Sequence, residues 1–144
     1  MSTSPATSRS QSRSSNSSPR MSRHEIGVDL VDIERITAVL GKHPERFRRR
    51  VLTDAEQRYC GRHIERIAGR WAAKEAVSKV LGLGVRGVGW REIEVLPNWA
   101  GAPQVQLHAR AAARAASLGL EQVTVSISHE RKMAVAVAIA HMSA

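Results

Sequence analysis

The segment 133–140, MAVAVAIA, constrains the fold more than any other part of the sequence, because it is apolar throughout and alternates alanine with larger side chains. Successive side chains of a β-strand point to opposite faces, so the alanines share one face and the larger residues the other. Both faces are therefore expected to be buried, with a helix packed on the alanine face. The run is far too short for a transmembrane helix, which needs about 20 apolar residues, so no membrane partner is expected.

Hydrophobic periodicity and capping signals predict a mixture of strands and helices around this segment. The expected strands span 26–31, 90–96, 104–107, 123–128 and 133–140. The expected helices span 32 to 39 or 40, Thr53 to Gly61, 64–81 and 109–118, with Asp32 capping the first and a Thr53–Glu56 capping box opening the second. The first helix is expected to end at Gly41, before Pro44. No β-α-β unit repeats, so the predicted fold class is α+β.

The positive charge of the chain is unevenly distributed. The 144 residues suffice for one domain and carry a formal net charge of +9. Residues 1–24 contain four arginines, many serines and no acidic residue, so this tail is expected to be disordered. Met21 offers an alternative start, and residues 25–144 are expected to form the domain. Without the tail the charge is +5, which still favours an anionic partner.

Cysteine usage indicates the cellular compartment. Cys60 is the only cysteine, which excludes an internal disulfide and a multi-cysteine zinc site. No apolar region follows the arginines of the tail, so no secretory signal is expected. A reducing, cytoplasmic location is therefore predicted.

Asp29 is an anomaly in the strand IGVDLV, because it places a carboxylate among apolar residues. The strand period puts it on the face opposite Ile26, Val28 and Leu30. A buried carboxylate needs a partner, since an unpaired charge in a low-dielectric site is costly. Asp29 therefore belongs either to a polar site or to an exposed edge of the sheet.

The helix motif WAAKEAVSKVLG carries the second group of candidate residues. Lys74 and Ser78 share one edge of the helix, and Glu75 and Lys79 share the adjacent edge. The simplest explanation is a solvated Glu75–Lys79 ion pair, worth about 0.3–0.5 kcal/mol. The alternative is metal-assisted transfer at a diphosphate, in which Asp29 and Glu75 hold Mg²⁺ and Lys79 neutralises a phosphate. The surrounding alanines let another backbone approach, which favours the alternative.

His129 and the arginines permit more than one explanation. A histidine at a hairpin turn is more often solvent-exposed than catalytic, and a single one argues against a zinc site. Arginines cluster in 46–50 and recur every four residues from Arg58 to Arg70. They form either a solvated basic face or a track for phosphates or an acidic protein. Aromatic residues make up only 3% of the chain, which leaves few base-stacking platforms and disfavours nucleic acid.

Five segments occur in a fixed order: IGVDLVDIERI, RRRVLTDAEQRYC, RIAGRWAAKEAVSKVLGLG, WREIEVLPNWAGAP and VSISHERKMAVAVA. Together they resemble holo-acyl-carrier-protein synthase, the small bacterial branch of the 4′-phosphopantetheinyl transferases. The resemblance covers Ile26 to Ala140, and the G-x-D and R-W-A-A-K-E-A-x-S-K motifs are specific as a pair. It implies an antiparallel sheet packed on a long helix, and a homotrimer with active sites at the subunit boundaries.

The resemblance also implies an activity. The enzyme would move 4′-phosphopantetheine from coenzyme A, its co-substrate, to a serine of apo-acyl carrier protein in a Mg²⁺-dependent reaction that leaves adenosine 3′,5′-bisphosphate. Asp29 and Glu75 match the family's metal ligands. Lys79 matches the lysine near the diphosphate.

Three further positions carry implied roles. His129 matches the hairpin histidine near the coenzyme A site, where Gly84 is also expected to bind. Arg35 matches a position that contacts acidic residues of the carrier protein. The expected catalytic residues are thus Glu75, Lys79 and His129, and the base that deprotonates the serine is Glu75, His129 or a metal-bound water.

The sequence departs from the family pattern at two turns. Residues 82–84 read G-L-G where the family often has G-T-G, and residues 101–103 read G-A-P where it often has G-K-P. These changes weaken the inference of local substrate contacts. The competing hypothesis is a non-catalytic basic module that binds RNA or an acidic protein. Such a module has no need of Asp29 inside an apolar strand, so the enzyme is favoured.

Overall fold

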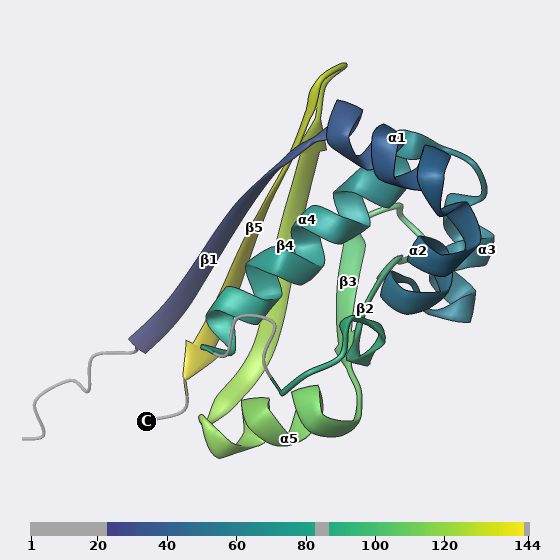
Figure 1. The fold of residues 1–144 in the computed structure, drawn as a ribbon. Coiled ribbons are helices and arrows are strands. Elements are labelled where there is room, and N and C mark those ends of the chain that lie inside the picture. Colours follow the sequence, from purple (N-terminus) through teal and green to yellow (C-terminus); the bar gives the residue numbers. More distant parts are fainter. Residues whose placement is uncertain (1–22, 83–86, 143–144) are drawn as a thin grey trace, which may run out of the picture.

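A computed structural model describes residues 23–82 and 87–142 (Figure 1). In chain order the elements are β1 (Arg23–Asp32), α1 (Ile33–Lys42), α2 (Pro44–Val51), α3 (Asp54–Cys60), α4 (Ile64–Val80), the 3₁₀ turn η1 (Trp90–Glu92), β2 (Ile93–Pro97), β3 (Pro103–Leu107), α5 (Ala109–Ser117), β4 (Leu120–His129) and β5 (Met133–Met142). The predicted α+β class is confirmed. No helix in the described residues is long and apolar enough to cross a membrane.

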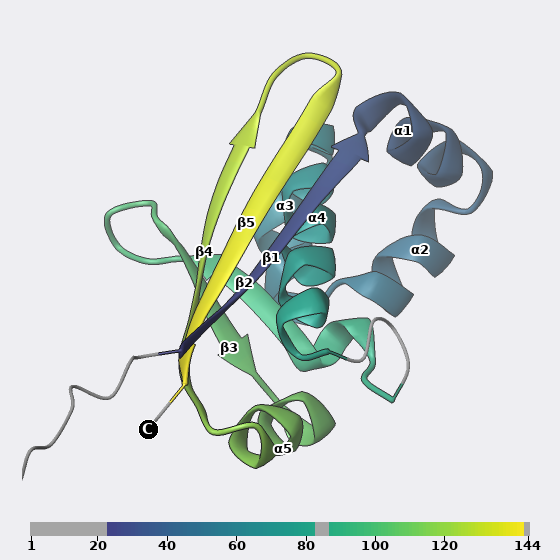
Figure 2. The same ribbon diagram turned by 90° about the vertical axis from the view of Figure 1, so that its left-hand side faces the viewer.

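The main sheet has three antiparallel strands in the order β1-β5-β4, and β2 pairs with β3 in a separate ribbon. Figure 2 shows β5 between its two neighbours with α4 behind the sheet, and α2 and α3 lie on the far side of α4 (Figure 1). The alanines of β5 are fully buried. The larger β5 residues face the other way and are half-buried or exposed. Both faces were expected to be buried, so in a single chain this holds only for the alanine face.

Gly27 and Gly69 allow α4 to lie against the sheet. A Cβ atom built on Gly27 of β1 would stand 2.1 Å from the carbonyl oxygen of Ala76 in α4, closer than any real contact. A Cβ atom on Gly69 of α4 would lie 3.2 Å from the side chain of Ile127 in β4. The helix and the sheet therefore meet backbone to backbone near Gly27, and no larger residue fits there.

Local capping signals predicted the helix starts well. Asp32 accepts hydrogen bonds from the backbone N–H groups of Glu34 (2.9 Å) and Arg35 (3.4 Å) at the start of α1. Thr53 and Glu56 form both halves of the expected capping box at the start of α3. These contacts satisfy N–H groups that have no partner inside the helix.

Two expected boundaries were wrong. The first helix was expected to end at Gly41, but α1 continues to Lys42. Pro44 follows that end as expected and also begins α2, which was not predicted, because proline lacks an N–H that the first helical turn does not need. The strand expected from residue 90 begins as the 3₁₀ turn η1.

The start of the folded part also differs from the expected residue 25. Arg23 and His24 pair with Met142 and His141 at the end of the sheet, so these two residues do not belong to the tail. The remainder of the expected tail, residues 1–22, lies outside the described residues.

We expect Gly27→Ala to lower the free energy of unfolding by about 3 kcal/mol, at the upper end of the usual cost of overpacking. The new methyl group would collide with the backbone of α4 and force the helix away from the sheet. Urea unfolding followed by circular dichroism, at one protein concentration, measures the change. Gly41→Ala is the control, because nothing lies within 4 Å of its added Cβ and alanine favours the helix. Equal losses in both variants would contradict the close approach.

Candidate active site

Asp29 lies on the helix-facing side of β1, as the strand period predicts, and its side chain is 18% exposed. Its Oδ1 lies 3.2 Å from Nζ of Lys79 on α4. The same Nζ donates to the carbonyl oxygen of Val28 at 2.7 Å. Among the described residues, the ion pair that Lys79 forms is thus with the strand and not with Glu75 on its own helix. The simple surface ion pair considered from the sequence is wrong.

Glu75 shares a pocket with Asp29. The pocket has a volume of about 350 Å³, and both carboxylates line it together with Asp32 and Arg35. Burial raises the pKa of Glu75, and the nearby carboxylate of Asp29 raises it further, while Lys79 acts in the opposite direction. The two carboxylates are therefore close enough to repel one another.

This donor set fits a hard divalent cation. Mg²⁺ is commonly held by one or two carboxylates, with water and substrate phosphates completing its shell. A cation between Asp29 and Glu75 would relieve the repulsion that raises the pKa of Glu75. The described residues contain no group of three or more His, Cys, Asp or Glu side chains that could hold a metal, and a two-carboxylate magnesium site does not require one.

The remaining wall of this pocket is apolar and aromatic. Ile36 and Val39 of α1, Phe47 of α2 and Trp71 of α4 line it. The rings of Phe47 and Trp71 lie 5.7 Å apart, and Trp71 lies 4.6 Å from Trp90, measured between ring centroids. Arg35 is exposed where this wall meets the carboxylates. The site thus offers a polar centre beside a surface for an apolar group.

His129 does not join these residues within one chain. It ends β4 and lines a separate pocket of about 390 Å³ between the β4–β5 turn and the start of α4, with His63, Glu65, Arg66, Glu130 and Arg131. Strand β5 separates β4 from β1 in the sheet. Gly84 lies outside the described residues. The structure therefore brings together Asp29, Glu75, Lys79 and Arg35, and leaves His129 apart.

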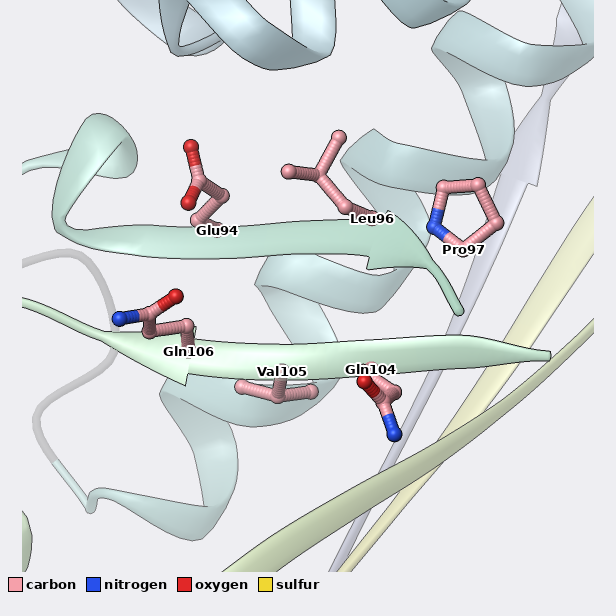
Figure 3. A pocket seen from close by; sticks show the side chains of 6 residues that line it. All are labelled: Glu94, Leu96, Pro97, Gln104, Val105 and Gln106. Atoms are coloured by element: carbon pink, nitrogen blue, oxygen red, sulfur yellow. The ribbon is translucent and has the colours of Figure 1, made fainter. Parts of the chain in front are cut away.

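A third pocket, on the ribbon formed by β2 and β3, contains no expected site residue (Figure 3). Glu94 lines it, but its carboxylate is already engaged. One oxygen accepts from the hydroxyl of Thr53 at 2.6 Å, and the other lies 3.3 Å from Nε2 of His108. This pocket is not part of the candidate site.

Sequence reasoning missed a fully buried ion pair. Lys74 pairs with Glu56 at 2.6 Å, and both side chains are 0% exposed. Burial lowers the pKa of Lys74, and Glu56 counteracts this effect. The capping box predicted the local role of Glu56 but not its partner, which lies on another helix.

The arginine series is also partly structural. Arg48 donates to the backbone oxygens of Gly61 and Gln57. Arg70 is buried and donates to the carbonyl oxygen of Val95 at 3.1 Å. The series from Arg58 to Arg70 is therefore not one continuous surface track, which weakens the hypothesis of a basic binding face.

Known proteins identify the family of the chain. The family model described as "4'-phosphopantetheinyl transferase superfamily" matches residues 25–138. Holo-[acyl-carrier-protein] synthase from Herpetosiphon aurantiacus is 45% identical over 101 residues, covering 65% of this chain and 80% of that protein. The synthase from Gloeobacter violaceus is 47% identical over 100 residues, covering 67% and 76%.

Solved structures of the same name share the fold. The Neisseria meningitidis synthase matches with a TM-score of 0.75 and 31% identity, covering 81% of this chain and 96% of that one. The Helicobacter pylori synthase, in complex with coenzyme A, matches with a TM-score of 0.73 and 29% identity, covering 80% and 98%.

The fold and these relatives together define a group-transfer enzyme of the α+β class. The chain belongs to the 4′-phosphopantetheinyl transferase superfamily, in its holo-acyl-carrier-protein synthase family. The competing hypothesis of a non-catalytic basic module is wrong.

Glu75→Gln is expected to stabilise the metal-free protein at neutral pH. The folded-state pKa of Glu75 lies above its ordinary value of 4.5. The native protein therefore binds more protons than the unfolded chain between these two pKa values, and stability falls as pH rises through that window. Glutamine mimics the protonated acid, so the gain should be present at neutral pH and vanish in acid.

Thermal unfolding of the metal-free protein across pH measures this difference. Glu121→Gln, at an exposed position of β4, is the control and should follow wild type. A Glu75→Gln variant less stable than wild type at neutral pH would contradict the repulsion between the two carboxylates.

Proposed function

We propose that the chain transfers the 4′-phosphopantetheine group from coenzyme A to a serine hydroxyl of apo-acyl carrier protein. The serine oxygen forms a bond to the phosphorus that carries pantetheine, and the bond from that phosphorus to the bridging oxygen of the diphosphate breaks. The serine proton passes to a base, and adenosine 3′,5′-bisphosphate leaves. The observation that carries the proposal is the placement of Asp29 and Glu75 in one pocket, with Lys79 paired to Asp29.

We assign Asp29 and Glu75 as the ligands of Mg²⁺. When bound, the metal would neutralise negative charge on the diphosphate oxygens. The Lys79 side chain is 51% exposed, so it is available to bind a phosphate oxygen beside Asp29. Glu75 is our candidate for the group that takes up the serine proton, because its carboxylate is only half-buried and lies in the same pocket as Asp29.

Arg35 is the proposed contact for the carrier protein. Its guanidinium is exposed at the rim of the carboxylate pocket, at the start of α1. Helix α2, whose Phe47 lines the same pocket, carries the exposed arginines Arg46, Arg49 and Arg50. An acidic protein would be attracted to this surface and its serine brought toward the two carboxylates.

We infer that the active enzyme is a homotrimer. The outer face of the sheet supports this, because Ile26, Val28 and Leu30 are 67%, 53% and 62% exposed and pair across β1 and β5 with further apolar residues. An apolar patch of this kind marks an interaction surface. Self-association would also give His129 and Gly84 a place in a coenzyme A site completed by a neighbouring copy, since His129 lies apart from Glu75 within one chain.

Asp29→Asn and Glu75→Gln each remove a metal ligand. Loss of a residue that only supports a ligand lowers activity about 10–100-fold, so each of these variants is expected to reduce transfer by more than that. Intact mass of apo-acyl carrier protein incubated with coenzyme A and Mg²⁺ measures the transfer, and EDTA should abolish it in wild type. Asp54→Asn, at an exposed carboxylate that pairs with Arg91, is the control. Full transfer by either site variant would overturn the metal assignment.

Arg35→Glu should raise the KM for the carrier protein about 10-fold, equivalent to about 1.4 kcal/mol, and leave the KM for coenzyme A unchanged. Steady-state kinetics with each substrate varied in turn separates the two constants. Arg23→Glu, at the opposite end of β1, is the charge-matched control. Equal effects of the two variants would show that Arg35 acts only through net charge.

Val28→Asp should convert the trimer to a monomer, because it places a charge in the centre of the apolar face. Sedimentation velocity measures the mass of the assembly. Ala113→Asp, on the exposed side of α5, should leave the assembly intact. A monomeric wild-type protein would contradict the inferred trimer.

A further inference from the structure

The buried pair of Lys74 and Glu56 has no part in the proposed chemistry, yet its polar contacts are complete. Lys74 Nζ donates to the backbone oxygens of Trp90 and Ile93 as well as to Glu56. Glu56 accepts from the backbone N–H groups of Thr53 and Val95, each at 2.9 Å. The network therefore joins α4 to α3, η1 and β2.

This network holds one side of α4, and the sheet holds the other. Consecutive residues of a helix point about 100° apart, so Ala72 and Ala76 lie on roughly the opposite side from Lys74. The side of α4 that faces the sheet carries small residues there. The backbone of Ala76 lies against Gly27 of β1, and Gly69 lies against the side chain of Ile127 in β4. Side chains that small do not interlock, so they resist rotation or sliding of the helix only weakly.

The polar side of α4 resists this rotation, because its hydrogen bonds are directional. Hydrogen bonds from Lys74 reach three separate acceptors, and Arg70, one turn earlier on the same side, donates to the carbonyl oxygen of Val95. Each of these bonds fails if the helix turns, because hydrogen bonds weaken steeply away from linearity. Glu75 follows Lys74 directly, so the rotation that satisfies Lys74 also determines where the Glu75 carboxylate lies.

We propose that Lys74 and Glu56 are positioning residues, which fix the rotation of α4 and thereby hold Glu75 beside Asp29 for cation binding. The inference rests on the proposed function in one respect, that Asp29 and Glu75 bind a divalent cation. The first lysine of the K-E-x-x-x-K motif thus supports the site through the helix, while the second, Lys79, reaches the site itself.

A purely structural role makes a different prediction from a positioning role. Loss of a structural contact lowers the fraction of folded protein but leaves the cation affinity of the folded molecules unchanged. Loss of a positioning contact weakens the cation affinity of molecules that are still folded. The two roles are therefore separated by measuring binding well below the melting temperature of each variant.

The experiment is titration of the full chain with Mn²⁺, a paramagnetic substitute for Mg²⁺, followed by electron paramagnetic resonance of the free ion. Lys74→Met and Glu56→Gln should each weaken binding by about 10–100-fold, as loss of other outer-shell partners does. Lys74→Arg, which keeps the charge, should recover most of the affinity. Val123→Ala, a buried position of β4, is the control for destabilisation alone and should bind as wild type does.

Wild-type affinity in folded Lys74→Met would overturn the inference. Glu56→Gln retains a hydrogen-bond acceptor at the same position and decides the question if Lys74→Met does not fold. A failure of the proposed function gives a different result. If Asp29 and Glu75 do not bind a cation, Asp29→Asn will bind Mn²⁺ as the wild-type protein does.

Discussion

The close approach of α4 to β1 is the contact on which the rest of the structure depends. Gly27 leaves no side chain between the strand and the backbone of Ala76, so the two elements meet directly. Asp29 lies two residues further along the strand, and Glu75 and Lys79 flank the same point of the helix. The ion pair between Asp29 and Lys79 and the shared pocket of Asp29 and Glu75 both follow from this short separation. The small residues that build the core therefore also build the site.

Much of the fold could be predicted because its signals are local. The capping box of α3, the Asp32 cap of α1 and the alanine face of β5 follow from residues within a few positions of one another. Helix α2 was missed because Pro44 has two meanings, the end of one helix or the start of the next, and the sequence does not choose between them. The side of β1 on which Asp29 lies was predicted from strand period alone.

The site was harder to predict, because its contacts join distant parts of the chain. Local spacing offers Lys79 a possible i,i+4 partner in Glu75, but the ion pair it forms is with Asp29 on another element. The motif also contains two lysines that local spacing treats alike, although Lys74 is buried against Glu56 and Lys79 is half exposed. The arginines divide similarly, since Arg70 binds the backbone of β2 while Arg35 is exposed beside the pocket. Net charge alone therefore overstates the basic surface that is free to bind a partner.

The central claim is that Asp29 and Glu75 act as one cation site. The most direct measurement is a double-mutant cycle of Mn²⁺ affinity on wild type, Asp29→Asn, Glu75→Gln and the double variant. Substitutions of two residues that bind the same ion have strongly non-additive effects on affinity. The double variant should therefore bind Mn²⁺ about as weakly as either single variant. Losses that add, with each single variant keeping part of the affinity, would show two independent carboxylates and contradict the account.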